Sequence, residues 1–234
     1  MKRFRTLFIV SCTLLSVAAA NRGGRPPAAT DPSLDAVLAR LDECAINFKG
    51  LAADIRKIAH TDVVNVDDVD SGTIVVKRVK PHDIRIRIEL TNPQQIVVIG
   101  GGKVQVFKPK TNEAQEVELG KNRGVVDQFM LLGFGSNSAE LKNAYIVTSG
   151  GADSINGEKT SRIVLVPKDK EILARVKKCE LWISEKGWTL QQKFYTGGGD
   201  YVLSTYSAMK VNPFIADKDL RLELPKGVKF GKLK

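Results

Sequence analysis

The chain has 234 residues, of which 43% are hydrophobic, and this is enough to build the core of one domain, since all-β domains often reach such a length. Only 6% of the residues are aromatic, so Val, Ile, Leu and Ala must fill most of that core. The net charge is +10, but the 36 Lys and Arg residues are mixed with 26 acidic residues and lack interleaved aromatic side chains, which argues against nucleic-acid binding and favours a solvated surface.

The first twenty residues have the pattern of a secretory signal peptide. Lys2, Arg3 and Arg5 precede an uncharged, mainly apolar stretch that runs from residue 6 to Ala20 and ends in small residues. A membrane-spanning helix needs roughly 20 apolar residues, which is more than this stretch supplies. We therefore expect cleavage near Ala20 and export across the inner membrane into the periplasm.

An alternative reading of the same segment concerns Cys12. The sequence Ile9-Val10-Ser11-Cys12 resembles the site at which a bacterial lipoprotein is acylated. However, six uncharged residues separate Cys12 from Arg5, which is short for a signal-peptide apolar region, and the apolar run continues beyond the cysteine. The expectation is a cysteine inside a cleaved signal peptide.

Residues 21–32 contain Gly, Pro and small polar residues and predict a flexible leader. Residues 33–49 then have the three- and four-residue apolar spacing of an amphipathic helix, which Gly50 ends and which Asp31 or Ser33 can cap. The apolar positions of this predicted helix are Leu34, Val37, Leu38, Leu41, Ala45 and Phe48.

After Gly50 the pattern changes to the alternation that is typical of half-buried β-strands. It is clearest over residues 84–90, where apolar and charged side chains strictly alternate. Further strands are predicted at 51–58, 72–79, 95–99, 103–108, 116–119, 144–149, 161–167, 178–184, 189–196, 201–211 and 220–224. Glycine-containing turns are predicted at 70–72, 100–102, 156–157, 186–187 and 197–199.

Such a series of hairpins has to bury one apolar face, either by closing towards a barrel or by covering that face with a helix. We therefore predict a mainly β (α+β) fold, an incomplete antiparallel β-barrel that the N-terminal helix and a short helical lid at residues 125–132 cover. Residues 33–234 are expected to form a single domain.

Residues that could carry covalent chemistry are scarce. His60 and His82 are the two histidines, and neither has a partner at metal-ligand spacing. The sequence has no G-x-S-x-G elbow and no CxxC pair. We expect no enzymatic activity, no metal and no cofactor. Cys44 and Cys179 fit either a disulfide or two buried thiols.

Several short motifs occur in the order found in one known family. The first helix passes directly into a strand at Asn47–Gly50, and Gly72–Arg78 is a strand that begins with glycine and ends in a basic pair. Gly102–Pro109 has a G-K-x-x-x-F-x-P pattern, Leu181–Leu190 contains L-W-I followed by glycine, and Asp219–Val228 ends in P-x-G-V. With this order the chain resembles the LolA/LolB-like periplasmic lipoprotein carriers.

The resemblance implies a soluble periplasmic carrier that binds the acyl chains of lipoproteins, or lipids, in an apolar cavity and helps to sort them to the outer membrane. It implies partners in an inner-membrane release complex and an outer-membrane acceptor, and we expect a monomer. It also assigns a lid-fastening role to Arg78. Because Val79 and Lys80 intervene before Pro81, where the family has proline directly after arginine, Lys80 is the alternative position for that role.

The same alternation fits a hollow or a packed interior. If the interior is hollow, we expect its wall to comprise Leu38, Leu41, Phe48, Ile84, Ile86, Ile88, Val104, Val106, Phe129, Met130, Ile163, Leu165 and Ile183. The alternatives to a carrier are a non-carrier envelope protein on the same fold, such as a stress sensor or structural module, and an outer-membrane lipoprotein receptor if Cys12 is acylated.

Overall fold

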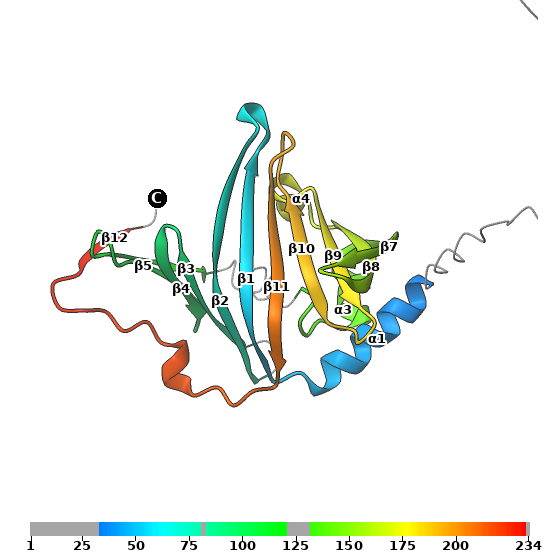
Figure 1. Ribbon diagram of the computed structural model, residues 1–234, viewed down its shortest axis with the longest axis horizontal. Coiled ribbons are helices and arrows are strands. Elements are labelled where there is room, and N and C mark those ends of the chain that lie inside the picture. Colours follow the sequence, from blue (N-terminus) through cyan, green and yellow to red (C-terminus); the bar gives the residue numbers. More distant parts are fainter. Residues whose placement is uncertain (1–32, 81–82, 121–131, 233–234) are drawn as a thin grey trace, which may run out of the picture. The chain divides into compact units, whose positions relative to one another are not determined.

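The computed structural model describes residues 33–80, 83–120 and 132–232 (Figure 1). The predicted signal peptide and leader, the lid residues 125–131 and His82 lie outside this part of the chain. In the described ranges no helix combines the length and the apolar character that crossing a bilayer requires.

In the described residues, eleven antiparallel strands form one sheet that does not close on itself, and a short twelfth strand pairs in parallel with one edge (Figure 1). Their order across the sheet is β12-β6-β5-β4-β3-β2-β1-β11-β10-β9-β8-β7. The prediction of a mainly β, open antiparallel fold with an N-terminal helix is therefore confirmed. The strands are β1 Gly50–Thr61, β2 Val66–Lys80, β3 Asp83–Thr91, β4 Gln94–Gly100, β5 Lys103–Lys108, β6 Glu113–Glu118, β7 Tyr145–Ile155, β8 Glu158–Pro167, β9 Lys178–Ser184, β10 Thr189–Tyr195, β11 Tyr201–Val211 and β12 Lys229–Lys232.

The N-terminal helix α1 is Leu34–Asn47, within the predicted range. Ser33 is its N-cap, because the Ser33 hydroxyl accepts a hydrogen bond from the Ala36 N–H at 3.3 Å. The structure adds two short helices that the sequence analysis missed, α3 Ser138–Ala144 and α4 Lys170–Arg175, and two single 3₁₀ turns, η1 Asp62–Val64 and η3 Asp217–Leu220. These elements are too short to show an apolar period.

The strand predicted at 220–224 is wrong. The segment leaves η3 without joining a ladder, and the last strand is β12 instead. A side chain of the sheet contacts its backbone, because the Arg87 guanidinium donates to the Arg221 carbonyl at 2.6 Å. The Lys77 ammonium donates at 2.9 Å to the carbonyl of Ile215, which precedes η3. Alternating leucines therefore do not mark a strand here, because the segment lies against the sheet rather than within it.

The turn predicted at 70–72 is also wrong, because β2 continues through it. A Cβ atom at Gly72 would lie 1.7 Å from the Glu89 carbonyl oxygen, so glycine is needed for close approach to β3 rather than for a turn. Asp70 is buried, and its carboxylate accepts hydrogen bonds from the backbone N–H groups of Thr91 and Asn92 at the end of β3.

The interior contains two apolar clusters. We call one the helix core, because it includes residues of α1, and the other the sheet core, which involves mainly β1 to β4. The helix core comprises Val37, Leu38, Leu41, Leu132, Leu141, Tyr145, Ile163, Leu165, Cys179, Leu181 and Ile183. The sheet core comprises Phe48, Leu51, Ala53, Ile55, Ile74, Val76, Ile84, Ile86, Leu90, Ile99, Phe134 and Tyr206.

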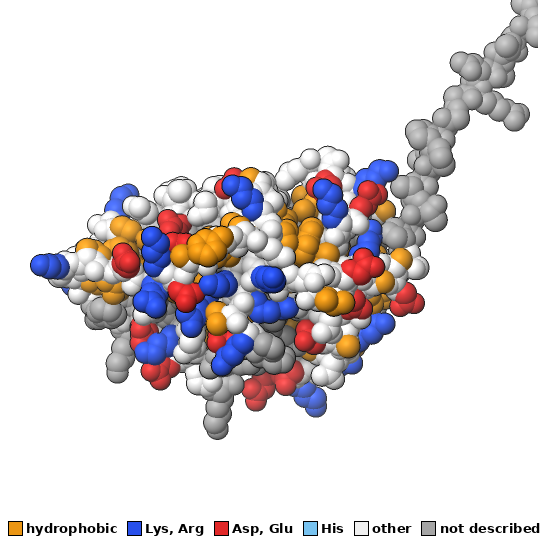
Figure 2. Space-filling model, turned by 90° about the horizontal axis from the view of Figure 1, so that it is seen from below, with side chains coloured by type: hydrophobic (Ala, Val, Ile, Leu, Met, Phe, Trp, Pro, Cys, Tyr) orange, Lys and Arg blue, Asp and Glu red, His pale blue; other side chains and the backbone are white. Residues whose placement is uncertain are grey.

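On the outside, charges of both signs alternate. Figure 2 shows Lys and Arg side chains interspersed with Asp and Glu on the face that is seen from below in Figure 1. One outer ion pair is Lys77 with Asp217 at 2.7 Å, and another is Arg87 with Glu89 at 2.6 Å. This face has the mixed charge of a solvated surface.

Candidate apolar binding cavity

An apolar cavity of about 420 Å³ opens next to the sheet core. This volume lies within the range of roughly 300–1,000 Å³ that is typical of small-ligand sites. The residues that line the cavity come from six strands and two connecting segments: Ile55, Lys57, Ile74, Val76, Ile86, Ile88, Leu90, Gln95, Val97, Phe134, Val176, Gln192, Phe194, Val202, Ser204 and Tyr206.

The cavity has a mouth and a floor, because burial changes in the same direction along three neighbouring strands. On β11, Ser204 is half-buried and Tyr206 is buried. On β10, Phe194 is half-buried and Gln192 is buried, and on β1 the half-buried Lys57 is followed inward by Ile55. The mouth therefore lies towards the β1–β2 and β10–β11 turns, and the buried end lies towards Tyr206 and, on β2 and β3, towards Val76 and Ile86.

Residues 132–138, which we call the strap, run through the interior and are fixed by side chains of the sheet. The Thr189 hydroxyl donates to the Gly133 carbonyl at 2.7 Å, and the Gln192 amide donates to the Leu132 carbonyl. Both contacts are buried, where a satisfied hydrogen bond avoids a large desolvation penalty. The strap therefore has a defined position beneath β10.

The other end of the strap is tied to α1. The backbone N–H and the hydroxyl of Ser138 both donate to the Asp42 carboxylate, at 2.5 and 2.6 Å. In addition, the Arg78 guanidinium donates to the Gly135 carbonyl at 2.5 Å and to the Ala45 carbonyl near the end of α1 at 3.1 Å. Helix, strap and sheet are thus joined by charge-assisted hydrogen bonds.

Arg78 lies over the Phe48 ring, with its guanidinium carbon 5.4 Å from the ring centroid. Burial lowers the pKa of Arg78, and the nearby Glu140 carboxylate opposes this shift. The strap that Arg78 contacts begins at Leu132, the last residue of the predicted lid. The other lid residues, 125–131, lie outside the described residues, so lid fastening stays a prediction. Lys80, the alternative position for that role, is exposed at the end of β2.

The structure separates the predicted wall residues into groups. Ile86 and Ile88 line the cavity. Three others belong to or pack against the sheet core without lining the cavity: Phe48, Ile84 and Val104. Five pack in the helix core: Leu38, Leu41, Ile163, Leu165 and Ile183. Val106 is buried outside both clusters, and Phe129 and Met130 lie outside the described residues.

Sequence reasoning missed the half of the wall that β1, β10 and β11 supply. The reason is that Gln192 and Ser204 point inward beside apolar neighbours, which hides the alternation on these strands. Phe134 was missed because it belongs to an irregular segment without a periodic pattern. The available sequence signal was the glycine directly before it, Gly133. In the structure Gly133 has φ +84°, a left-handed backbone conformation that favours glycine.

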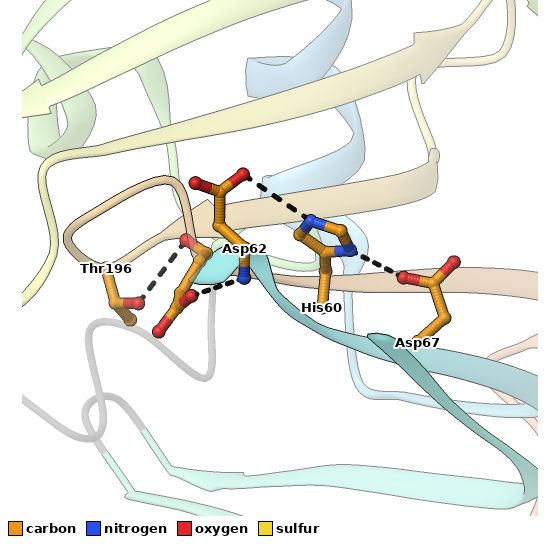
Figure 3. Close-up of polar contacts among 5 residues, drawn as sticks. His60, Asp62, Asp67 and Thr196 are labelled. Atoms are coloured by element: carbon orange, nitrogen blue, oxygen red, sulfur yellow. Dashed lines mark hydrogen bonds and ion pairs between the residues drawn. The ribbon is translucent and has the colours of Figure 1, made fainter. Parts of the chain in front are cut away.

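The strands at the mouth are joined at their tips (Figure 3). The His60 ring lies between two carboxylates, with its Nδ1 2.7 Å from Asp67 and its Nε2 3.7 Å from Asp62. The Asp62 N–H donates to the Asp200 carboxylate at 2.8 Å, and the His60 ring stacks on Tyr201 with the centroids 4.6 Å apart. These contacts hold the β1–β2 and β10–β11 turns together.

The two cysteines do not form a disulfide: Cys44 and Cys179 are both free thiols. The Cys44 thiol donates to the Lys186 carbonyl at 3.0 Å, whereas Cys179 is fully buried in the helix core. Burial raises the pKa of both thiols. Among the described residues, no group of three His, Cys, Asp or Glu side chains is arranged to hold a metal ion.

Comparisons with known proteins agree at the level of the fold. No protein-family model and no curated protein matches the sequence. An uncharacterised conserved protein from Thermus thermophilus has a similar structure, with 12% identity, a TM-score of 0.51, and coverage of 85% of this chain and 98% of that one.

Two further structures illustrate the range of matches. MucB is 16% identical with a TM-score of 0.49, and the match covers 82% of this chain but only 64% of MucB. A LolA-superfamily protein from Nitrosomonas europaea is 14% identical with a TM-score of 0.40, over 80% of this chain and 97% of that one. At these identities the likeness concerns the fold alone.

Proposed function

We propose that this protein is a periplasmic carrier that binds the acyl chain of a lipoprotein or lipid in the cavity between β1–β4 and β10–β11. The observation that carries the proposal is the apolar lining of a cavity that has a half-exposed mouth and a buried floor. Each methylene that leaves water for such a site contributes about 0.8 kcal/mol. The task requires an apolar hollow and no acid, base or nucleophile.

The lining also indicates which end of a ligand enters first. Of the described lining residues, Lys57 is the one with a formal charge, and it lies at the mouth. An acyl chain would therefore enter tail first and leave an anionic or polar head beside the Lys57 ammonium. Transport to the outer membrane, with a release complex on one side and an acceptor on the other, is the sorting role that the fold resemblance supports.

The experiment that tests this function compares two tryptophan variants of β11. Ser204 lines the cavity, whereas Ser207 on the same strand is exposed and does not. The purified mature protein is incubated with inner-membrane vesicles that carry a fluorescent triacylated lipoprotein, and the fluorescence released into the supernatant is measured. We expect the native protein and Ser207→Trp to extract the lipoprotein and Ser204→Trp to lose most of this activity.

If the native protein stays empty and extracts nothing, the carrier function is wrong, and the non-carrier envelope role becomes the better explanation. If Ser204→Trp extracts as well as the native protein, the protein carries lipoproteins but not in this cavity. Determination of the mature N-terminus tests the third alternative, an outer-membrane lipoprotein receptor. Such a receptor requires an acylated Cys12, whereas a soluble carrier begins at Asn21.

A further inference from the structure

We infer that Phe134 is the floor of the cavity and limits the length of the acyl chain that it accepts. The inference rests on the proposed function and goes beyond it, since it names a residue that selects among ligands of the same class. It concerns a single linear chain that enters between Lys57 and Val202 and ends against the Phe134 ring.

The ring of Phe134 is at the buried end of the cavity. It lines the cavity but is only 2% exposed, and it forms a T-shaped pair with the Tyr206 ring, with the centroids 4.8 Å apart and an interplanar angle of 79°. The Tyr206 hydroxyl donates to the Gln192 amide oxygen at 3.1 Å. Two aromatic rings, one of them anchored by a buried hydrogen bond, therefore close this end.

The backbone of Phe134 is fixed on both sides, so the floor is rigid. The preceding carbonyl, of Gly133, accepts from Thr189, and the following carbonyl, of Gly135, accepts from Arg78. Gly133 has φ +84°, and a Cβ atom there would lie 2.1 Å from the Thr189 hydroxyl oxygen. A ligand that pushed the ring aside would have to break these contacts.

The remainder of the sheet core lies beyond this floor. Phe48, Leu51 and Ala53 are buried in the same cluster as Phe134 but do not line the cavity. The space they occupy is filled and apolar, with the rings of Phe48 and Trp188 6.3 Å apart. A chain cannot extend past Phe134, but removal of the ring would open further space with apolar walls.

A length limit has a measurable signature. While each added methylene enters the cavity, affinity should rise about fourfold per methylene, as follows from roughly 0.8 kcal/mol per buried CH₂. Once the terminal methyl group reaches Phe134, additional methylenes stay in water at the mouth and affinity levels off. The chain length at which the rise in affinity stops therefore measures the depth of the cavity.

The test measures this break with an even-numbered series of saturated fatty acids, by displacement of anilinonaphthalene sulfonate from the purified mature protein. We expect Phe134→Ala to move the break to longer chains and Phe134→Trp to move it to shorter ones. Phe194→Ala is the matched control, because Phe194 lines the same cavity at its half-buried mouth. It should weaken binding of all chains and leave the break in place.

The outcomes separate the inference from the function on which it rests. If the native protein binds no fatty acid of any length, the proposed function fails. If it binds the series but the break is the same in Phe134→Ala and Phe134→Trp, the function stands and the inference is overturned. Should Phe134→Ala not fold, the shift of the break to shorter chains in Phe134→Trp, or its absence, still decides the matter.

Discussion

The Arg78 guanidinium donates a hydrogen bond of 2.5 Å to the carbonyl of Gly135, so that an arginine of β2 fixes the residue that follows the floor of the cavity. The same guanidinium donates to Ala45 near the end of α1, where helix carbonyls lack partners within the helix. One side chain thus sets the positions of both the N-terminal helix and the strap relative to the sheet.

We expect Arg78→Met to free the strap while its methylenes keep their packing. Loss of two hydrogen bonds to a charged donor should lower the free energy of unfolding by about 2 kcal/mol, and amide hydrogen exchange over residues 132–138 should accelerate. Arg87→Met is the control, since Arg87 donates to the backbone of Arg221 on the outer face. Equal exchange in the strap of both variants would contradict the role of Arg78.

A second prediction concerns the backbone of the strap. Gly133→Ala should destabilise the protein by about 3 kcal/mol or more, because the left-handed conformation is unfavourable for alanine and the new Cβ would overlap the Thr189 hydroxyl. Gly157→Ala has nearly the same φ, +82°, but no atom within 4 Å of the new Cβ. It should lose about 1–2 kcal/mol, and urea unfolding measures the difference. Similar losses in the two variants would show that Gly133 is not confined by the sheet.

The cation at the mouth leads to a prediction about ligand heads. Lys57→Met should weaken the binding of a fatty acid by about threefold to fivefold, as expected for a solvated charge pair, and should leave binding of the corresponding fatty alcohol unchanged. Lys193→Met is the control, because Lys193 points away from the cavity and lies over the Tyr201 ring, 3.6 Å from its centroid. Titration calorimetry measures the affinity for both ligands. An equal loss of affinity for the acid and the alcohol would show that the Lys57 charge does not attract the ligand head.

The thiols give a prediction that depends on pH. In the native protein at pH 8, iodoacetamide should label Cys44 slowly and leave Cys179 unmodified, because burial raises the pKa of each thiol above its usual 9.0 and Cys179 is also inaccessible. The Cys179 thiol ionises at a lower pH in the unfolded chain than in the folded protein. Its contribution to the free energy of unfolding is therefore fully present below pH 9 and declines as the pH rises further. Intact-mass spectrometry before and after alkylation, with and without urea, checks both points; a mass two hydrogens lower and no labelling would instead indicate a disulfide.

Local patterns were sufficient to predict most of the sheet. The ranges of β5, β9 and β11 agree with the predicted strands to the residue, because glycine turns or charged residues bound them and their apolar side chains alternate or run together. Alternation at Ile86 and Ile88 also identified one wall of the cavity. In these places, the information lies within a few neighbouring residues.

The floor and the opposite wall could not be predicted in this way. Their positions depend on contacts between distant residues: Thr189 holds Gly133 across 56 positions, and Arg78 holds Gly135 across 57. The choice of which apolar face is filled depends on α1, whose buried side chains belong to the same cluster as Ile163 and Leu165, while the β1–β4 side lines the cavity. A periodic pattern is the same on a filled and on a hollow face, so the sequence predicted inward positions without separating the two.

The central claim is that an acyl chain occupies the cavity beside the sheet core and not the space under α1. Methyl NMR spectra with a fatty acid that carries a nitroxide at its tail measure this directly, because the label broadens nearby methyl resonances. We predict the strongest broadening for Ile55, Ile74 and Ile86, which line the cavity, and clearly weaker broadening for Ile163, Leu165 and Ile183 in the helix core. Broadening confined to the helix core, or no broadening at saturating ligand, would contradict it.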